Sequence, residues 1–113
     1  MEEGISRKSV KVSDEFKAHR TQIYYYTFDT FGYVQAERYF QKIKDALHTL
    51  YVHYTAYPEC RHIPTKSRKY RNIIFDAHLI IYRITTERIE VLDILHAASS
   101  IGKIRNVRKI QLS

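Results

Sequence analysis

The chain has 113 residues, 44% of them hydrophobic, and a net charge of +7. This length suits a single domain with one core, and the apolar content is that of a folded protein. No apolar run approaches the roughly 18 residues that a membrane span needs. Residues 1–4 are acidic and no apolar segment follows them, so we expect no secretory signal and a cytoplasmic location. The single cysteine, Cys60, agrees with a reducing compartment.

The positive charge is concentrated in two stretches. Residues 60–75 hold five cations and no acid, and residues 94–113 hold four cations and no acid. These nine cations exceed the net charge, so the rest of the chain is slightly acidic. We therefore expect an acidic partner to bind at these stretches. The first stretch supplies the candidate binding residues Arg61, Lys66, Arg68, Lys69 and Arg71.

The N-terminal part predicts a strand followed by a helix. Residues 9–12 alternate polar and apolar side chains, as a short strand does. Ser13 then precedes two acids and is typical of a helix N-cap, so a helix is predicted over residues 14–31. Arg20 lies on the apolar stripe of this helix. We expect its methylene groups to pack while its charged head reaches water.

A second helix is predicted after Gly32, over residues 34–54, where apolar side chains recur every three or four positions. Two such helices joined by a glycine form a helical hairpin. The consecutive tyrosines at positions 24–26 point about 100° apart on a helix and cannot form one stacking platform for bases. We assign them to core and surface packing.

Residues 70–96 predict three antiparallel strands, because they contain short β-branched runs separated by connections of hairpin length. The middle run is apolar on both faces, so it is expected to be central and covered on both sides. A meander of this size needs a hydrophobic partner, which the helical hairpin supplies. The predicted fold is α+β, an N-terminal strand and a helical hairpin packed on a small antiparallel sheet. The runs cover residues 73–75, 79–84 and 89–95.

Two charged residues, Arg83 and Asp93, lie within the apolar strands, and we expect them either to be cross-strand neighbours or to serve a functional role. The predicted domain covers residues 1–96, and residues 97–113 form a basic tail. Apolar side chains at three-residue intervals permit a short amphipathic helix in this tail, although the main fold does not obviously need it.

Several kinds of site are not expected. The three glycines are isolated, so there is no glycine-rich phosphate loop. The six histidines are scattered without a tight pair, so neither a metal nor a cofactor is expected.

The order strand, helical hairpin and meander resembles the RelE/ParE superfamily of bacterial toxins. The resemblance spans about residues 9–96, and its most specific pieces are IIYRI in the middle strand and VLDILH at the end of the last strand. Such proteins are the growth-arresting halves of type II toxin–antitoxin pairs, often plasmid stabilisation modules. The resemblance therefore implies a cognate antitoxin as partner and leaves a homodimer or a toxin–antitoxin hetero-oligomer open.

The resemblance also implies candidate catalytic residues. The RelE-like branch cleaves messenger RNA on the ribosome, for which Arg71 and Arg83 could hold phosphate and His96 matches the strand-end histidine. However, residues 97–100 are alanines and serines, where ribonuclease members commonly place a tyrosine or histidine and many ParE-like members place arginines. Because His96 shares its face with apolar residues, a packed structural histidine is favoured over a catalytic one.

We favour a ParE-like toxin that inhibits DNA gyrase by binding and has no chemistry of its own. In this interpretation the cations of residues 61–71 and Arg83 meet either the target or an acidic antitoxin segment. The first alternative is a RelE-like, ribosome-dependent messenger RNA endonuclease. Further alternatives are an inactive toxin homologue and a basic RNA-binding domain, since phosphate affinity needs only clustered Lys and Arg.

Overall fold

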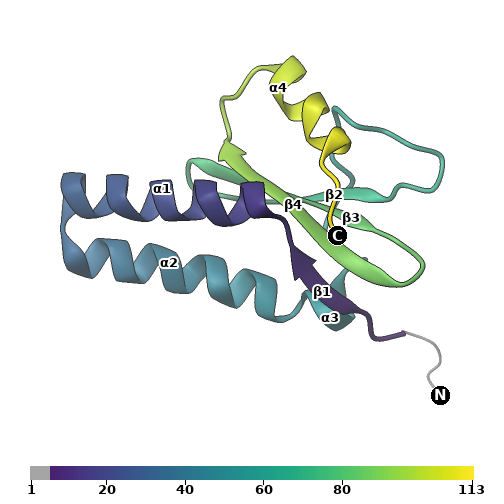
Figure 1. Ribbon diagram of the computed structural model, residues 1–113, viewed down its shortest axis with the longest axis horizontal. Coiled ribbons are helices and arrows are strands. Elements are labelled where there is room, and N and C mark those ends of the chain that lie inside the picture. Colours follow the sequence, from purple (N-terminus) through teal and green to yellow (C-terminus); the bar gives the residue numbers. More distant parts are fainter. Residues whose placement is uncertain (1–5) are drawn as a thin grey trace.

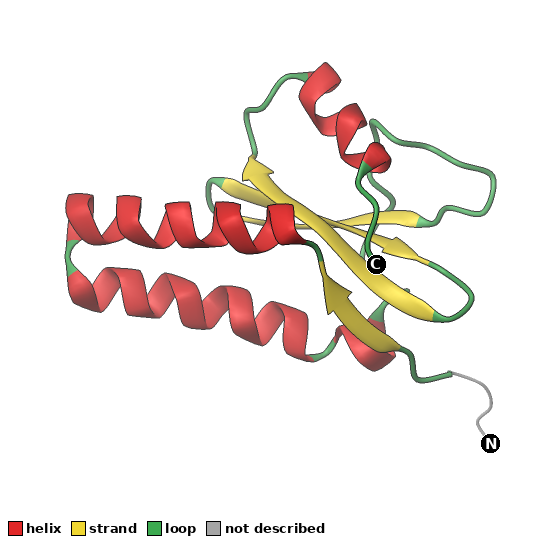
Figure 2. Cartoon of the chain, in the orientation of Figure 1, coloured by secondary structure: helices red, strands yellow, loops and turns green. Residues whose placement is uncertain are grey.

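The computed structural model describes residues 6–113, so the predictions for residues 1–5, including the acidic N-terminus, lie outside the described residues. A strand and a helical hairpin precede a sheet, and a helical tail closes the chain (Figures 1 and 2). The predicted α+β class is confirmed. The elements are β1 (Ser9–Val12), α1 (Asp14–Phe31), α2 (Tyr33–His48), α3 (Leu50–His53), β2 (Tyr70–Phe75), β3 (His78–Ile84), β4 (Arg88–His96), α4 (Ile101–Asn106) and the 3-10 helix η1 (Val107–Lys109).

Helix α1 begins and ends where the sequence predicts. The Ser13 hydroxyl accepts the N–H of Phe16 at 2.9 Å and donates to the Leu92 carbonyl at 2.5 Å, so the N-cap also fastens α1 to β4. Gly32 has a φ of 91°, a conformation that favours glycine, and its N–H donates to the Phe28 carbonyl at 2.8 Å. The chain then reverses, and the hairpin of α1 and α2 projects beyond the sheet (Figure 1).

The spacing predicts one continuous helix to residue 54, but the structure divides this segment into two helices. Helix α2 ends at His48, and α3 forms a separate short turn after Thr49. The interruption places Leu50 in the core, where it is fully buried. It also brings this segment against the start of β1, since the N–H of Lys8 donates to the Tyr51 carbonyl at 2.9 Å.

Arg20 and the first tyrosine of the triplet pack between the two long helices. The Arg20 guanidinium lies 5.2 Å from the ring centroid of Phe16 and 5.5 Å from that of Phe40. Its charged head therefore also contacts two aromatic rings, which the prediction of packed methylene groups and a solvated head does not include. Tyr24 meets Phe40 edge-on at 5.6 Å, while the other two tyrosines are exposed.

The sheet has the strand order β1-β4-β3-β2. Strands β2, β3 and β4 form the predicted antiparallel meander, and β1 pairs parallel with β4. The middle strand β3 is internal and covered on both faces, as predicted. Ile80 and Tyr82 face the first core, formed with the helical hairpin, whereas Leu79 and Ile81 face a second core on the other side.

Strand β4 contains a bulge that the sequence pattern does not reveal. Ile81 is opposite Asp93, but the next residue of β3, Tyr82, is opposite Val91. The extra residue breaks the alternation of β4. As a result Val91 packs in the first core and Leu95 in the second, although strict alternation assigns both to one face.

The expected Arg83–Asp93 pair does not form. The hairpin register places Glu90 opposite Arg83, because Ile84 and Ile89 are directly paired next to the turn. Asp93 instead accepts a hydrogen bond from Nδ1 of His19 on α1 at 2.6 Å. The prediction is therefore wrong for both partners.

The C-terminal tail covers the face of the sheet opposite the hairpin (Figure 1). Helix α4 forms where the spacing permits it, and the Ser100 hydroxyl caps it by accepting the N–H of Lys103. Ile104 and Val107 are buried in the second core. The tail, which the sequence leaves outside the 1–96 domain, thus supplies part of the packing of the sheet.

Replacing Ile104 with alanine should destabilise the fold by about 3 kcal/mol, because it removes a buried side chain and leaves a cavity. The matched control is Ile101→Ala, one turn earlier on α4, where the side chain is 50% exposed and the cost should stay within about 0.5 kcal/mol. Urea unfolding measures both. Equal effects would mean that the tail does not pack on the sheet.

Candidate functional site

The two basic stretches meet on the side of the sheet that the tail covers. Nε of Arg105 in α4 donates to the His62 carbonyl at 3.3 Å, which joins the tail to the loop between α3 and β2. Eight cations of the loop and the tail are exposed there, and we call them the basic face. They are Arg61, Lys66, Arg68, Lys69, Lys103, Arg105, Arg108 and Lys109.

A groove of about 840 Å³ opens beside the tail, and we call it the basic groove. It brings together three of the candidate residues, Lys69, Arg71 and Arg83, whereas Arg61, Lys66 and Arg68 do not line it. Two further cations line it, Lys8 and Arg108. Arg108 belongs to the second basic stretch, but Lys8 lies in neither stretch and no signal in the sequence points to it.

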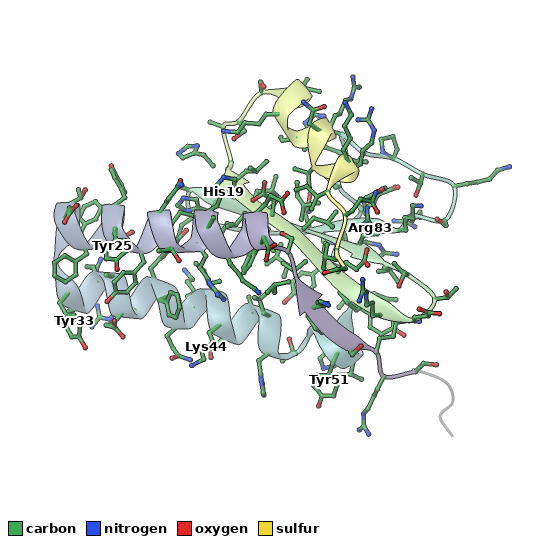
Figure 3. The ribbon with its side chains drawn as sticks, viewed as in Figure 1. His19, Tyr25, Tyr33, Lys44, Tyr51 and Arg83 are labelled. Atoms are coloured by element: carbon green, nitrogen blue, oxygen red, sulfur yellow. The ribbon has the colours of Figure 1, made fainter. Side chains whose placement is uncertain are left out.

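Arg83 lies beneath the basic face, between the sheet and the tail (Figure 3), and is only 9% exposed. Its Nε and Nη2 lie 2.8 and 2.7 Å from Oε1 of Glu90. It also donates to two tail carbonyls, those of Arg108 at 3.3 Å and Ile110 at 3.1 Å. The ring of Tyr70 packs against the guanidinium at 5.8 Å. Arg83 therefore connects β3, β4 and the tail.

Both members of this buried pair stay charged. Burial raises the pKa of Glu90, but hydrogen bonds from Arg83 and Arg88 outweigh it and hold the pKa below its usual range. Burial likewise lowers the pKa of Arg83, but hydrogen bonds with Tyr70 and Glu90 leave it raised. The groove thus has an ionised carboxylate at its base.

Arg71 is bound by backbone oxygens. Its Nε donates to the Arg68 carbonyl at 2.8 Å, and its Nη1 donates to the carbonyls of Thr55 and Tyr57 at 3.1 and 2.9 Å. These three carbonyls come from both ends of the loop that carries the first basic stretch. Arg71 therefore shapes this loop, and the exposed cations Lys66 and Lys69 are the more accessible candidates.

His96 lies at the end of β4 and is exposed, not packed as its apolar neighbours suggest. Its Nδ1 accepts the N–H of Ala98 at 3.0 Å, and its ring lies 5.8 Å from that of His78. It does not line the basic groove, so the structure separates it from Arg71 and Arg83.

No group of three or more His, Cys, Asp or Glu side chains within residues 6–113 is arranged to hold a metal ion. Over the same residues, no helix has the length and apolar character needed to cross a membrane.

The strand order and the position of the hairpin define a small α+β domain of the RelE/ParE type, with a basic face beside its tail. Residues 10–101 match the family model described as the ParE toxin of the type II toxin–antitoxin system, parDE. The chain therefore belongs to the ParE toxin family, and the resemblance to the ParE-like branch is confirmed.

A solved structure, "Chromosomal ParDE TA system from P. aeruginosa", shares the fold. It has 17% sequence identity and a TM-score of 0.66, and the match covers 80% of this chain and 96% of that chain. No curated protein matches the sequence.

Replacing Arg83 with methionine should cost about 3 kcal/mol of unfolding free energy, because it leaves the buried Glu90 carboxylate with one cation fewer. Methionine keeps most of the packed methylene volume, so the loss reports on the charge. Arg61→Met, on the exposed part of the basic face, is the control and should change stability by less than about 0.5 kcal/mol. Matching losses in the two variants would contradict a structural role for Arg83.

Because of this ion pair, we also expect the free energy of unfolding to fall at acidic pH. The pKa of Glu90 is lowered by folding, so its contribution is present above the ordinary value of 4.5 and is lost as the pH falls through the lowered folded value. Glu90→Gln should therefore flatten the fall in stability below pH 4.5. Glu87→Gln, at an exposed turn position, should leave the profile unchanged. Denaturant unfolding from neutral to acidic pH measures both, and an unaltered profile for Glu90→Gln would refute the assignment.

Proposed function

We propose that this chain is the toxin of a type II toxin–antitoxin pair and inhibits DNA gyrase by binding, without chemistry of its own. This proposal rests on one observation: the two candidate catalytic arginines already make hydrogen bonds within the protein. Arg71 is bound by three carbonyls, and Arg83 by Glu90 and the tail. Both order the basic groove from within, so they are poorly placed to stabilise a reacting phosphate.

The basic face supports a binding role. Its exposed cations surround the tail and loop, and a cluster of one sign attracts partners of the opposite sign and speeds their association. We propose that a cognate antitoxin neutralises the toxin by covering this face with an acidic segment. Lys66 and Lys69 on the loop are the proposed contact residues, with Arg61 and Arg68 beside them.

The RelE-like alternative, cleavage of messenger RNA, is favoured by one observation. His96 is exposed at the end of β4 and lies beside a second histidine, His78. Imidazoles are the commonest general acids and bases, so this end of the sheet could take part in proton transfer. This alternative predicts cleaved transcripts, whereas gyrase inhibition leaves transcripts intact, so transcript integrity distinguishes the two functions.

Inducing the chain without its partner should arrest growth, relax plasmids and leave transcripts intact. Co-expression of the antitoxin encoded beside it should restore growth and supercoiling. With purified components, gyrase should lose supercoiling activity in proportion to the added toxin. Cleaved transcripts with normal plasmid topology would replace this proposal with the endonuclease. Unaffected growth would favour an inactive homologue or a basic RNA-binding domain.

The basic face is tested by charge reversal within the same experiment. The double variant Lys66→Glu/Lys69→Glu should weaken gyrase inhibition or antitoxin affinity by at least about tenfold, because it places like charges against an acidic partner. The control, Arg38→Glu/Lys44→Glu, makes the same change in net charge at two exposed positions on α2; Lys44 is labelled in Figure 3. If both double variants behave alike, the effect is one of net charge and the basic face is not the contact surface.

A further inference from the structure

The tip of the hairpin of α1 and α2 exposes a large apolar surface. Six of the nine exposed large apolar side chains in the described part of the chain lie between positions 25 and 34. The surrounding segment is almost uncharged, since residues 21–36 contain one charged side chain, Asp29. The tip projects beyond the sheet, away from the tail (Figure 1), so the fold itself leaves this surface uncovered. The six side chains are Tyr25, Tyr26, Phe28, Phe31, Tyr33 and Val34.

Five rings on the two helices form one connected group, which we call the aromatic cluster. Tyr24 packs edge-on against Tyr25 and Phe40, with ring centroids 5.8 and 5.6 Å apart. Its ring centroid also lies 6.5 Å from that of Phe28, and Phe28 meets Tyr33 of α2 edge-on at the same distance. The rings therefore hold one another in place before any partner binds, which lowers the entropic cost of covering them.

A hollow of about 310 Å³ opens within the aromatic cluster, between the two helices. Its wall contains Tyr24, Tyr25 and Phe40, together with Thr21 and Glu37. A cavity of about 150 Å³ holds a benzene molecule, so the hollow has room for a tyrosine ring. The Glu37 carboxylate accepts the Tyr24 hydroxyl, and a carboxylate has lone pairs for further donors. The hollow therefore suits an aromatic ring that carries a hydroxyl group.

The aromatic cluster presents such a ring at its other end. Tyr33 begins α2 at the tip and is 61% exposed, whereas the hollow lies one to two turns further along α2, at Glu37 and Phe40. Figure 3 shows Tyr25 and Tyr33 at the tip of the hairpin. Two hairpins packed antiparallel about a two-fold axis place the Tyr33 ring of each copy in the hollow of the other. Such a contact is self-complementary and closed, as the symmetry of a homodimer requires.

The exposed area of the aromatic cluster is sufficient for a dimer. Tyr25, Phe28 and Tyr33 are between 43% and 62% exposed. With roughly 200 Å² for each aromatic side chain, these three rings present roughly 330 Å². Apolar atoms form about 60% of an interface, so two copies would bury roughly 1,100 Å² in total. This area exceeds the minimum of about 1,000 Å² that is expected of a specific interface.

The distribution of charge favours the aromatic cluster as the surface that meets a second copy. Each copy carries a net charge of +7, so two basic faces repel one another. The basic face surrounds the tail and the loop, whereas the tip lies away from the tail (Figure 1). Repulsion between exposed charges is screened over about 8 Å at physiological salt. A second copy that approaches the uncharged tip therefore meets the least repulsion.

We propose that this chain forms a homodimer through the aromatic cluster. Tyr33 of each copy occupies the hollow of the other, and its hydroxyl donates to the partner's Glu37. The interface lies apart from the basic face, so both basic faces of the dimer stay open to acidic partners. The dimer rests on the apolar surface of the hairpin alone, and it does not depend on gyrase inhibition.

Analytical ultracentrifugation of the purified full chain tests the dimer. It should show a reversible equilibrium between 13.5 kDa and twice that mass, with a Kd in the micromolar range. Raising the salt concentration from about 0.05 to about 0.5 M should preserve or tighten the dimer, because salt screens the repulsion between the two cationic copies. A dimer bridged by nucleic acid would instead dissociate. Dissociation in salt, or a chain that stays monomeric at about 100 µM, well above the expected Kd, would overturn the proposal.

Variants at Tyr33 locate the interface. Tyr33→Ala removes the ring and should weaken the dimer by at least about tenfold. Tyr33→Phe keeps the ring and removes the hydroxyl, so it should weaken the dimer by about fivefold, as expected for one lost hydrogen bond. The control is Tyr51→Ala on α3, which removes a tyrosine that is 42% exposed outside the aromatic cluster and should dimerise like the parent chain. Circular dichroism should show the same fold in all three variants, since both positions are exposed.

Two results would contradict this interface. Equal dimerisation of Tyr33→Ala and the parent chain would place the contact elsewhere on the molecule. A monomeric parent chain whose Tyr33→Ala variant loses antitoxin affinity or gyrase inhibition would show that the aromatic cluster binds that protein and not a second copy.

Discussion

The buried ion pair between Arg83 and Glu90 determines how the C-terminal half of this fold is assembled. A charge removed from water is tolerated only when its donors and acceptors are paired, and the Arg83 guanidinium finds Glu90 on the neighbouring strand and two carbonyls in the tail. The tail is thereby held over the second core. Its cations then lie beside those of the loop, and two stretches separated in sequence become one basic face.

Periodicity predicts much of this fold because the forces behind it are local. The N-cap at Ser13, the glycine that ends α1 and the alternation in β3 each follow from a few neighbouring residues, and the structure confirms them. The break at Thr49, the bulge in β4 and the docking of the tail depend on contacts between distant segments. The apolar spacing of the tail predicts its helix but not where the helix docks, and the apolar pattern gives no sign of the break or of the bulge.

The candidate site, too, could be predicted only in part from the sequence. Charge counting identifies the basic stretches, but it cannot separate an arginine bound by carbonyls, such as Arg71, from an exposed lysine such as Lys69, because the tertiary structure supplies the partners. The contact between His19 and Asp93 could not be predicted either, because 74 positions separate the two residues in the sequence. The hairpin register pairs Arg83 with Glu90, which leaves Asp93 for a partner on α1.

The bulge in β4 and the docked tail both bring together residues that lie far apart in the sequence. The bulge disturbs the strand next to Asp93, whose carboxylate contacts His19 of α1. The tail contributes one cation, Arg108, to the basic groove. Because Ile104 and Val107 anchor α4 and η1 in the second core, apolar packing and the hydrogen bonds of Arg83 together set the position of this cation. A partner that moved the tail would therefore alter the basic groove and the basic face together.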